Sequence, residues 1–121
     1  MKKIYYRKLV RDKIPKRIEE SGGKYQIKTL SASGYKKEIL KKVEEEASGL
    51  AKAKVKSEIV AETGDLLDVL GEVKKAFGIT PAELTKSRTE EMKRKGAFRK
   101  RLYLLWAEDT GYKANEKKGK K

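Results

Sequence analysis

The chain has 121 residues, and 32 lysines and arginines against 18 aspartates and glutamates give it a formal net charge of +14. This length suits one domain, and the positive charge favours anionic partners such as nucleotides, nucleic acids or acidic lipids. The sequence contains no cysteine and no histidine. Disulfides, thiol nucleophiles, histidine bases, Ser-His-Asp triads and zinc sites with sulfur or imidazole ligands are therefore excluded. Carboxylates, hydroxyls and cations remain for any chemistry.

Neither a membrane span nor a signal peptide is expected. No run in the sequence approaches the roughly 18 apolar residues of a transmembrane helix, and Met1 to Lys8 lack the apolar stretch of a signal peptide. We therefore expect a cytoplasmic protein with no membrane partner. A chain of this length buries only about two thirds of the surface that its unfolded form exposes, so association with a second subunit is also expected.

The N-terminal part is expected to contain one short helix. Apolar residues recur at helical spacing between residues 9 and 21, with Pro15 near the first turn and a glycine pair, Gly22 and Gly23, after the end. Residues 25–30 alternate polar and apolar side chains, which is compatible with a short strand. Residues 31–34 are expected to form a turn.

Three further helices are expected downstream. Apolar residues repeat at helical spacing from Tyr35 to Lys54, and again from Ser57 to Phe77, where Gly78 ends the pattern. The segment from Thr80 to Glu83 then supplies a capping hydroxyl, a proline at the first helical position and a glutamate at the third, which together predict a helix start.

The C-terminal part has no clear periodicity. The run from Leu102 to Trp106 is expected to be a strand or a packed extended segment, and residues 112–121 a basic disordered tail. The sequence therefore predicts a mainly all-α domain over residues 1–111, followed by this tail.

The helix from Ser57 onward has an unusual distribution of charge. Between Ser57 and Val73 it carries five acids and neither lysine nor arginine. At about 100° per residue, four of the acids fall within roughly 80° of one another, and like charges at such spacing destabilise a helix by a few tenths of a kcal/mol per pair. A bound divalent cation would reverse that cost, because hard oxygen ligands are what magnesium and manganese take. The five acids are Glu58, Glu62, Asp65, Asp68 and Glu72.

A row of acids is often only a solvated helix face, but here the acidic stripe borders the apolar one. Val69 and Glu62 are only about 20° apart by helical rotation. The preceding helix carries three glutamates at 44–46. Helical rotation places Glu46 on the flank of its apolar stripe, from which it could point toward Glu62 and Asp65 across an antiparallel helix pair. These three residues are the candidate metal ligands.

Three elements of the chain resemble signatures of one family. Tyr6 to Pro15, with the sequence YRKLVRDKIP, resembles the N-terminal signature of a group of MazG-like pyrophosphohydrolases. Glu62 to Asp68 resembles their Glu-x-x-Asp helix, and Lys95 to Phe98 is similar to the Arg-Gly-Gly-Phe element that follows their third helix. The resemblance covers residues 5 to about 106. It implies an all-α fold in which antiparallel helix pairs from two chains form a four-helix bundle, as a homodimer or homotetramer, with metal sites facing nucleotide phosphates.

The resemblance also implies an activity, the hydrolysis of a nucleoside triphosphate to the monophosphate and pyrophosphate. Mg²⁺, or Mn²⁺ in its place, would be held by Glu46, Glu62 and Asp65, and Glu58 or Asp68 could orient the attacking water. Cations at both ends of the chain would neutralise the leaving pyrophosphate, and an aromatic residue would form a pocket wall. These substrate-binding candidates are Arg11, Lys13, Lys93, Arg94, Lys95 and, for the wall, Phe98.

One position departs from the family pattern. The family's first metal helix carries Glu-x-x-Glu, and alignment on the apolar positions makes Glu46 the first of these and Gly49 the second. A shift by one residue pairs Glu45 with Ser48 and restores nothing. Either Glu58 or Asp68 substitutes, or the site holds fewer metals, or catalysis has been lost.

Two other functions therefore stay open at this point. The chain could bind nucleotides or another protein without hydrolysing anything. Alternatively, the basic residues between positions 86 and 101 and the lysine-rich tail could follow a nucleic-acid backbone. A nucleic-acid binder gives no reason, however, for the acids on the helix from Ser57 onward.

Overall fold

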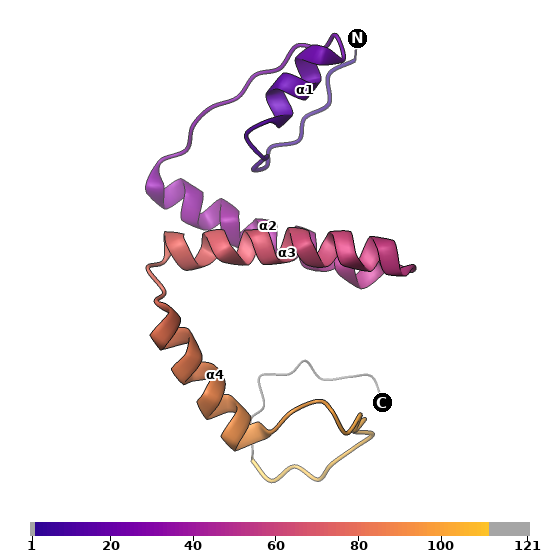
Figure 1. The fold of residues 1–121 in the computed structure, drawn as a ribbon, viewed down its shortest axis with the longest axis vertical. Coiled ribbons are helices and arrows are strands. Elements are labelled where there is room, and N and C mark those ends of the chain that lie inside the picture. Colours follow the sequence, from indigo (N-terminus) through magenta and orange to yellow (C-terminus); the bar gives the residue numbers. More distant parts are fainter. Residues whose placement is uncertain (1, 112–121) are drawn as a thin grey trace. The chain divides into compact units, whose positions relative to one another are not determined.

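The computed structural model describes residues 2–111, and the expectation of a disordered tail over 112–121 lies outside the described residues (Figure 1). The chain divides into two compact units with the boundary after Thr85. Within residues 2–111 the regular elements are helices, so the expected all-α class is confirmed. The helices are α1 (Ile14–Glu20), α2 (Ala32–Lys52), α3 (Lys56–Ala76) and α4 (Pro81–Lys95).

Helix α1 is shorter than the range 9–21 that its apolar spacing indicated. Pro15 explains the late start, because it has no N–H to donate and its ring would clash with the carbonyl four residues earlier in a longer helix. The Arg11 carbonyl instead accepts the N–H of Ile14 at 3.1 Å in a turn. At the other end, Gly22 adopts a φ of 80° and the N–H of Gly23 reaches the Ile18 carbonyl at 2.9 Å, which closes the helix.

Two expectations for residues 25–34 are wrong. Residues 23–31 form neither helix nor strand, because no other segment of the described chain offers a ladder for residues 25–30 to join. The turn expected at 31–34 is instead the start of α2. Ser31 caps that helix, since its Oγ accepts the N–H of Gly34 at 3.1 Å.

Helices α2 and α3 form an antiparallel pair joined by the three residues 53–55 (Figure 1). Their direction follows from contacts near both ends of the pair. Close to the connection, Gly49 lies beside Glu62. Toward the far end, the Tyr35 hydroxyl donates to Glu72 Oε2 at 3.2 Å. This pairing brings residues in the middle of α2 opposite the acidic turns of α3.

The seam between the two helices is narrow. Within residues 2–111 only Ile39 and Val69 are buried, at 4% and 8% exposure. Other apolar side chains on the pair stay open in the single chain, among them Leu40 at 51%, Val60 at 63% and Leu67 at 62% exposure. A single chain therefore leaves much of its apolar helix surface in contact with solvent.

Helix α4 begins as its sequence predicted. Thr80 Oγ1 accepts the N–H of Glu83 at 3.1 Å, and Glu83 Oε2 accepts the N–H of Thr80 at 2.9 Å, so each residue satisfies a backbone donor of the other. Gly78, with a φ of 63°, separates α3 from this start. Residues 101–110 are irregular, and no strand forms from Leu102 to Trp106. None of the helices within residues 2–111 is long and apolar enough to cross a bilayer.

Candidate functional site: an acidic cluster and the pocket beside it

Three carboxylates meet at the middle of the α2–α3 pair. Glu46 on α2 and Glu62 and Asp65 on α3 each have an oxygen within 4.8 Å of the others. Glu62 and Asp65 lie one turn apart on α3, and the antiparallel arrangement brings Glu46 opposite them. All three are half-buried. The residues that the sequence singled out as metal ligands thus lie together, and we call them the acidic cluster.

Gly49 on α2 leaves room for the carboxylate of Glu62 on α3. A Cβ added at Gly49 would lie 2.6 Å from Glu62 Oε2, too close for a real contact. The Glu62 carboxylate therefore lies in the space that a side chain at position 49 would need. Glu62 forms no hydrogen bond or ion pair with any other residue of the described chain. The departure from Glu-x-x-Glu is thus linked to the position of a carboxylate on the neighbouring helix.

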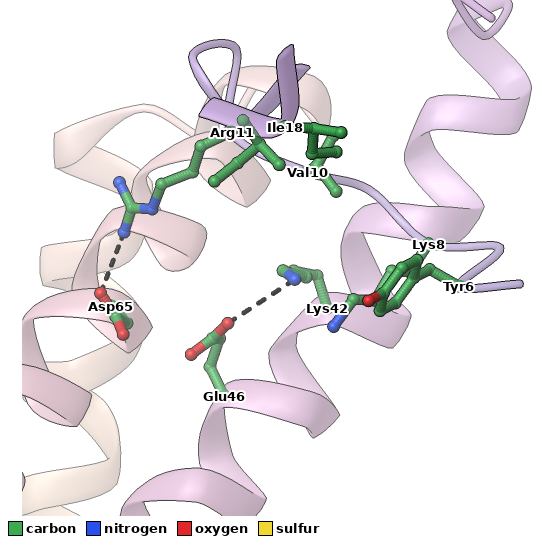
Figure 2. Close-up of a pocket in the computed structure, with 9 residues that line it drawn as sticks. Tyr6, Lys8, Val10, Arg11, Ile18, Lys42, Glu46 and Asp65 are labelled. Atoms are coloured by element: carbon green, nitrogen blue, oxygen red, sulfur yellow. Dashed lines mark hydrogen bonds and ion pairs between the residues drawn. The ribbon is translucent and has the colours of Figure 1, made fainter. Parts of the chain in front are cut away.

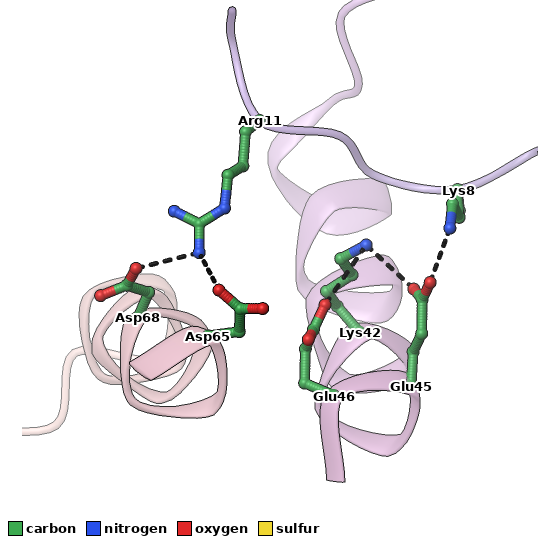
Figure 3. A network of polar contacts seen from close by, with 7 residues as sticks. All are labelled: Lys8, Arg11, Lys42, Glu45, Glu46, Asp65 and Asp68. Atoms are coloured by element: carbon green, nitrogen blue, oxygen red, sulfur yellow. Dashed lines mark hydrogen bonds and ion pairs between the residues drawn. The ribbon is translucent and has the colours of Figure 1, made fainter. Parts of the chain in front are cut away.

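Arg11 binds the α3 side of this region. Its Nη2 donates to Asp65 Oδ1 at 3.1 Å and to Asp68 Oδ2 at 2.9 Å, and Figure 3 shows the guanidinium between the two carboxylates. More than half of the Arg11 side chain is exposed. These hydrogen bonds, first that with Asp68, raise the pKa of Arg11.

Two lysines bind the α2 side. Lys42 Nζ lies 2.9 Å from Glu45 Oε2 and 3.7 Å from Glu46 Oε1, and Lys8 Nζ lies 2.6 Å from Glu45 Oε1 (Figure 3). The hydrogen bond from Lys8, followed by that from Lys42, lowers the pKa of Glu45, and the same bond to Glu45 raises the pKa of Lys8. The N-terminal segment, residues 2–13 before α1, is thus attached to α2 and α3 by charge-assisted hydrogen bonds.

The charges in this network do not balance. Five carboxylates face three cations, which leaves two more negative charges than positive ones. In a chain with a net charge of +14, this is a local reversal of sign. The carboxylates are Glu45, Glu46, Glu62, Asp65 and Asp68, and the cations are Lys8, Arg11 and Lys42.

A pocket of about 390 Å³ opens beside the acidic cluster (Figure 2). One wall is apolar and comes from the N-terminal segment and α1. The opposite side carries charges from the N-terminal segment and both long helices, including two members of the acidic cluster. The lining residues are Tyr6, Lys8, Val10, Arg11, Ile14, Ile18, Lys42, Glu46 and Asp65.

Two further candidates for water activation lie outside the acidic cluster. Glu58 accepts the backbone N–H of Lys54 at 3.3 Å, near the start of α3. Asp68 lies one turn beyond Asp65 and pairs with Arg11. Among the cations expected on the substrate, Arg11 lines the pocket, whereas Lys13 precedes α1 and is not a lining residue.

The C-terminal candidates belong to the second unit. Arg94 and Lys95 both pair with Glu91 of the same helix, the latter at 3.2 Å. Lys93 is in the last turn of that helix, and Phe98 is 98% exposed. Their roles in substrate binding stay predictions.

Three members of the network, Glu45, Lys42 and Lys8, were not predicted from the sequence. Helical rotation favoured Glu46 among the three glutamates at 44–46, yet Glu45 is the partner of Lys8. Lys42 had a usable signal, because it precedes Glu46 by four residues on a helix, a spacing at which opposite charges attract. Lys8 had none, since its partner lies 37 residues away.

Comparison with known proteins finds no matching family model, no matching curated protein and no matching solved structure.

The Lys8–Glu45 pair gives a pH-dependent prediction. Because the pKa of Glu45 is lowered from its usual 4.5, the pair stabilises the fold above about that pH and is lost as the pH falls through the lowered pKa. Lys8→Gln removes the largest cause of the lowering, so the pKa of Glu45 should rise toward 4.5, and the pH-dependent part of the stability should become smaller, with its loss complete at a higher pH. Carboxyl NMR titration measures this. Lys41→Gln, whose lysine pairs with Glu38 instead, should leave the Glu45 titration unchanged, and an unchanged titration in Lys8→Gln would refute the assignment.

Proposed function

We propose that the protein hydrolyses nucleoside triphosphates to nucleoside monophosphates and pyrophosphate in the cytoplasm, with Mg²⁺ or Mn²⁺ bound by the acidic cluster. The observation that carries the proposal is the convergence of Glu46, Glu62 and Asp65 from two helices to within 4.8 Å. The resemblance of three motifs to those of MazG-like pyrophosphohydrolases, in the same order along the chain, supports the choice of reaction.

The donor set fits a hard divalent cation. All three side chains offer oxygen, which is what Mg²⁺ and Mn²⁺ prefer. Magnesium binds oxygen at about 2.1 Å, so ligands on opposite sides of one ion lie about 4 Å apart, and the ligand atoms of the acidic cluster all lie within 4.8 Å of one another. The surrounding network has two negative charges in excess, which one divalent cation would neutralise.

The chain's own side chains then have separate tasks. A metal ion bound at the cluster would polarise the phosphate and lower the pKa of a bound water. Asp68 lies one turn from Asp65 on α3 and shares Arg11 with it, and in this proposal it would orient that water. Lys8, Arg11 and Lys42 line the adjoining pocket, where their charge would stabilise phosphate oxygens and the leaving pyrophosphate.

Removal of one ligand charge tests the proposal. Glu62→Gln and Asp65→Asn should each lower the rate of Mg²⁺-dependent pyrophosphate release by about 100-fold or more, because even residues that only support metal ligands contribute about 10- to 100-fold. Release is measured with purified protein and a panel of nucleoside triphosphates. Glu44→Gln is the matched control, since Glu44 is exposed on α2 and outside the network.

Release that is equal in parent and both variants would exclude the acidic cluster as the active site. A parent that binds Mn²⁺ in calorimetry but hydrolyses no triphosphate would contradict the proposed enzyme and favour the nucleotide-binding homologue without catalysis. Binding to DNA or RNA that falls steeply with salt, without any metal binding, would favour the nucleic-acid-binding alternative.

Gly49→Ala should separate stability from metal affinity. Alanine in place of a mid-helix glycine raises the free energy of unfolding by up to about 1 kcal/mol, but the added Cβ would meet Glu62 Oε2 at 2.6 Å and displace that carboxylate. We therefore expect weaker Mn²⁺ binding in calorimetry without loss of thermal stability. Gly71→Ala is the control, because nothing lies within 4 Å of its added Cβ. Equal Mn²⁺ affinity in both variants would show that Glu62 does not hold the ion.

We also propose that the active form is a homodimer or homotetramer in which a second copy covers the open apolar side of the α2–α3 pair. The proposal is supported by the small buried seam and by the exposure of Leu40, Val60 and Leu67. Val60 and Leu67 are seven residues apart and so share one face of α3. A charge on that face would oppose association, because it would be buried without a partner.

Sedimentation measures the association. Leu67→Lys should reduce the mass to that of a single chain, whereas Ser57→Lys, an exposed position at the start of the same helix, should keep the mass of the parent. A parent that sediments as a single chain at micromolar concentration would contradict the proposed assembly.

A further inference from the structure

We infer that the pocket beside the acidic cluster is the nucleotide subsite, in which the N-terminal segment and α1 hold the nucleoside while Lys8, Arg11 and Lys42 hold the phosphates. The inference rests on the proposed function and adds to it the residues that contact the substrate. Its starting point is a cavity of about 390 Å³, which is in the range of small-molecule sites.

The apolar wall consists of one residue of the N-terminal segment and two residues of α1. Val10 precedes α1, and Ile14 and Ile18 are four residues apart on it, so they share one face of the helix. Figure 2 shows Val10 and Ile18 together on the side of the pocket away from Glu46. Val10 is 45% exposed and the two isoleucines are half-buried. A flat apolar group in the pocket would cover surface that now contacts solvent.

The opposite side of the pocket carries cationic side chains that already bind carboxylates. Lys8, Arg11 and Lys42 each bind a carboxylate oxygen of this chain. Phosphate oxygens accept the same charge-assisted hydrogen bonds, so a phosphate chain could take over these donors. Glu46 and Asp65 line the same pocket and belong to the acidic cluster. A phosphate held here would therefore lie beside the proposed metal ligands.

The apolar wall and the charged side of the pocket together indicate which class of ligand fits. An inorganic polyphosphate would leave the apolar wall bare, and an uncharged apolar molecule would make no use of the three cations. A nucleotide carries both parts, an aromatic base and a polyanion. Val10, Ile14 and Ile18 have no side-chain hydrogen-bonding group, and apolar contacts discriminate weakly between ligands of similar shape. Purine and pyrimidine nucleotides should therefore bind with affinities within about tenfold of each other.

The test compares two probes on the full chain by calorimetry with Mg²⁺. One is a set of α,β-methylene deoxynucleoside triphosphates with four bases, which cannot release pyrophosphate, and the other is tripolyphosphate, which has no nucleoside. Val10→Ala and Ile18→Ala should weaken the nucleotide analogues about fivefold and leave tripolyphosphate unchanged. Lys8→Gln and Lys42→Gln should weaken both probes about tenfold.

Two control variants match these changes. Val55→Ala alters a valine of similar exposure in the α2–α3 connection, and Lys41→Gln alters the lysine next to Lys42; neither residue lines the pocket. Both should bind the two probes as the parent does. Val10 is exposed enough that Val10→Ala should fold normally, so this variant decides the matter if Ile18→Ala is unstable.

The assigned nucleoside wall would be overturned if Val10→Ala weakened both probes equally. It would also be overturned if no pocket variant changed the binding of the nucleotide analogues, or if the protein preferred one base by more than 100-fold. If all pocket variants release pyrophosphate and bind both probes as the parent does, the proposed subsite is wrong but the proposed hydrolysis stands. Analogue binding with the expected pattern, but no hydrolysis of natural triphosphates, would support the subsite and contradict the proposed reaction.

Discussion

Repulsion between the carboxylates of α2 and α3 is the interaction that the remainder of the first unit has to offset. Glu46, Glu62 and Asp65 are brought together by the antiparallel packing of two helices, although their charges oppose that packing. The apolar seam contributes little, since Ile39 and Val69 are its only buried residues in the described chain. The attraction of nearby cations and, in our proposal, of a divalent ion therefore has to offset the part of this repulsion that the small apolar seam does not.

This requirement explains why the N-terminal segment lies where it does. Arg11 and Lys8 attach it to α3 and α2 through acidic side chains, while its apolar residues face an open pocket. The segment is thus held mainly by charge. Ion pairs as exposed as these are individually weak and are screened by salt, so the attachment depends on several of them acting together.

Much of the fold followed from local patterns in the sequence, and the misses have physical causes. Thr80 and Glu83 predicted a helix start that the structure confirms, because capping uses neighbours in the chain. The closeness of Glu46, Glu62 and Asp65 followed from helical rotation once an antiparallel pair was assumed. The strand at 25–30 failed because alternation describes the faces of a segment and says nothing of a neighbour for its backbone. Lys8 and its partner were missed because no periodicity links residues 37 apart.

The very different chain separations within the site have a consequence for the order in which the protein forms. Residues 53–55 alone connect α2 and α3, so this hairpin closes a short loop and can assemble as soon as both helices have been synthesised. Arg11 leaves the ribosome earlier but must wait for acids 54 and 57 positions downstream. The bonds of Arg11 to Asp65 and Asp68 therefore close a much longer loop than the hairpin does, and the entropy of closing that loop makes them form after the two helices have paired.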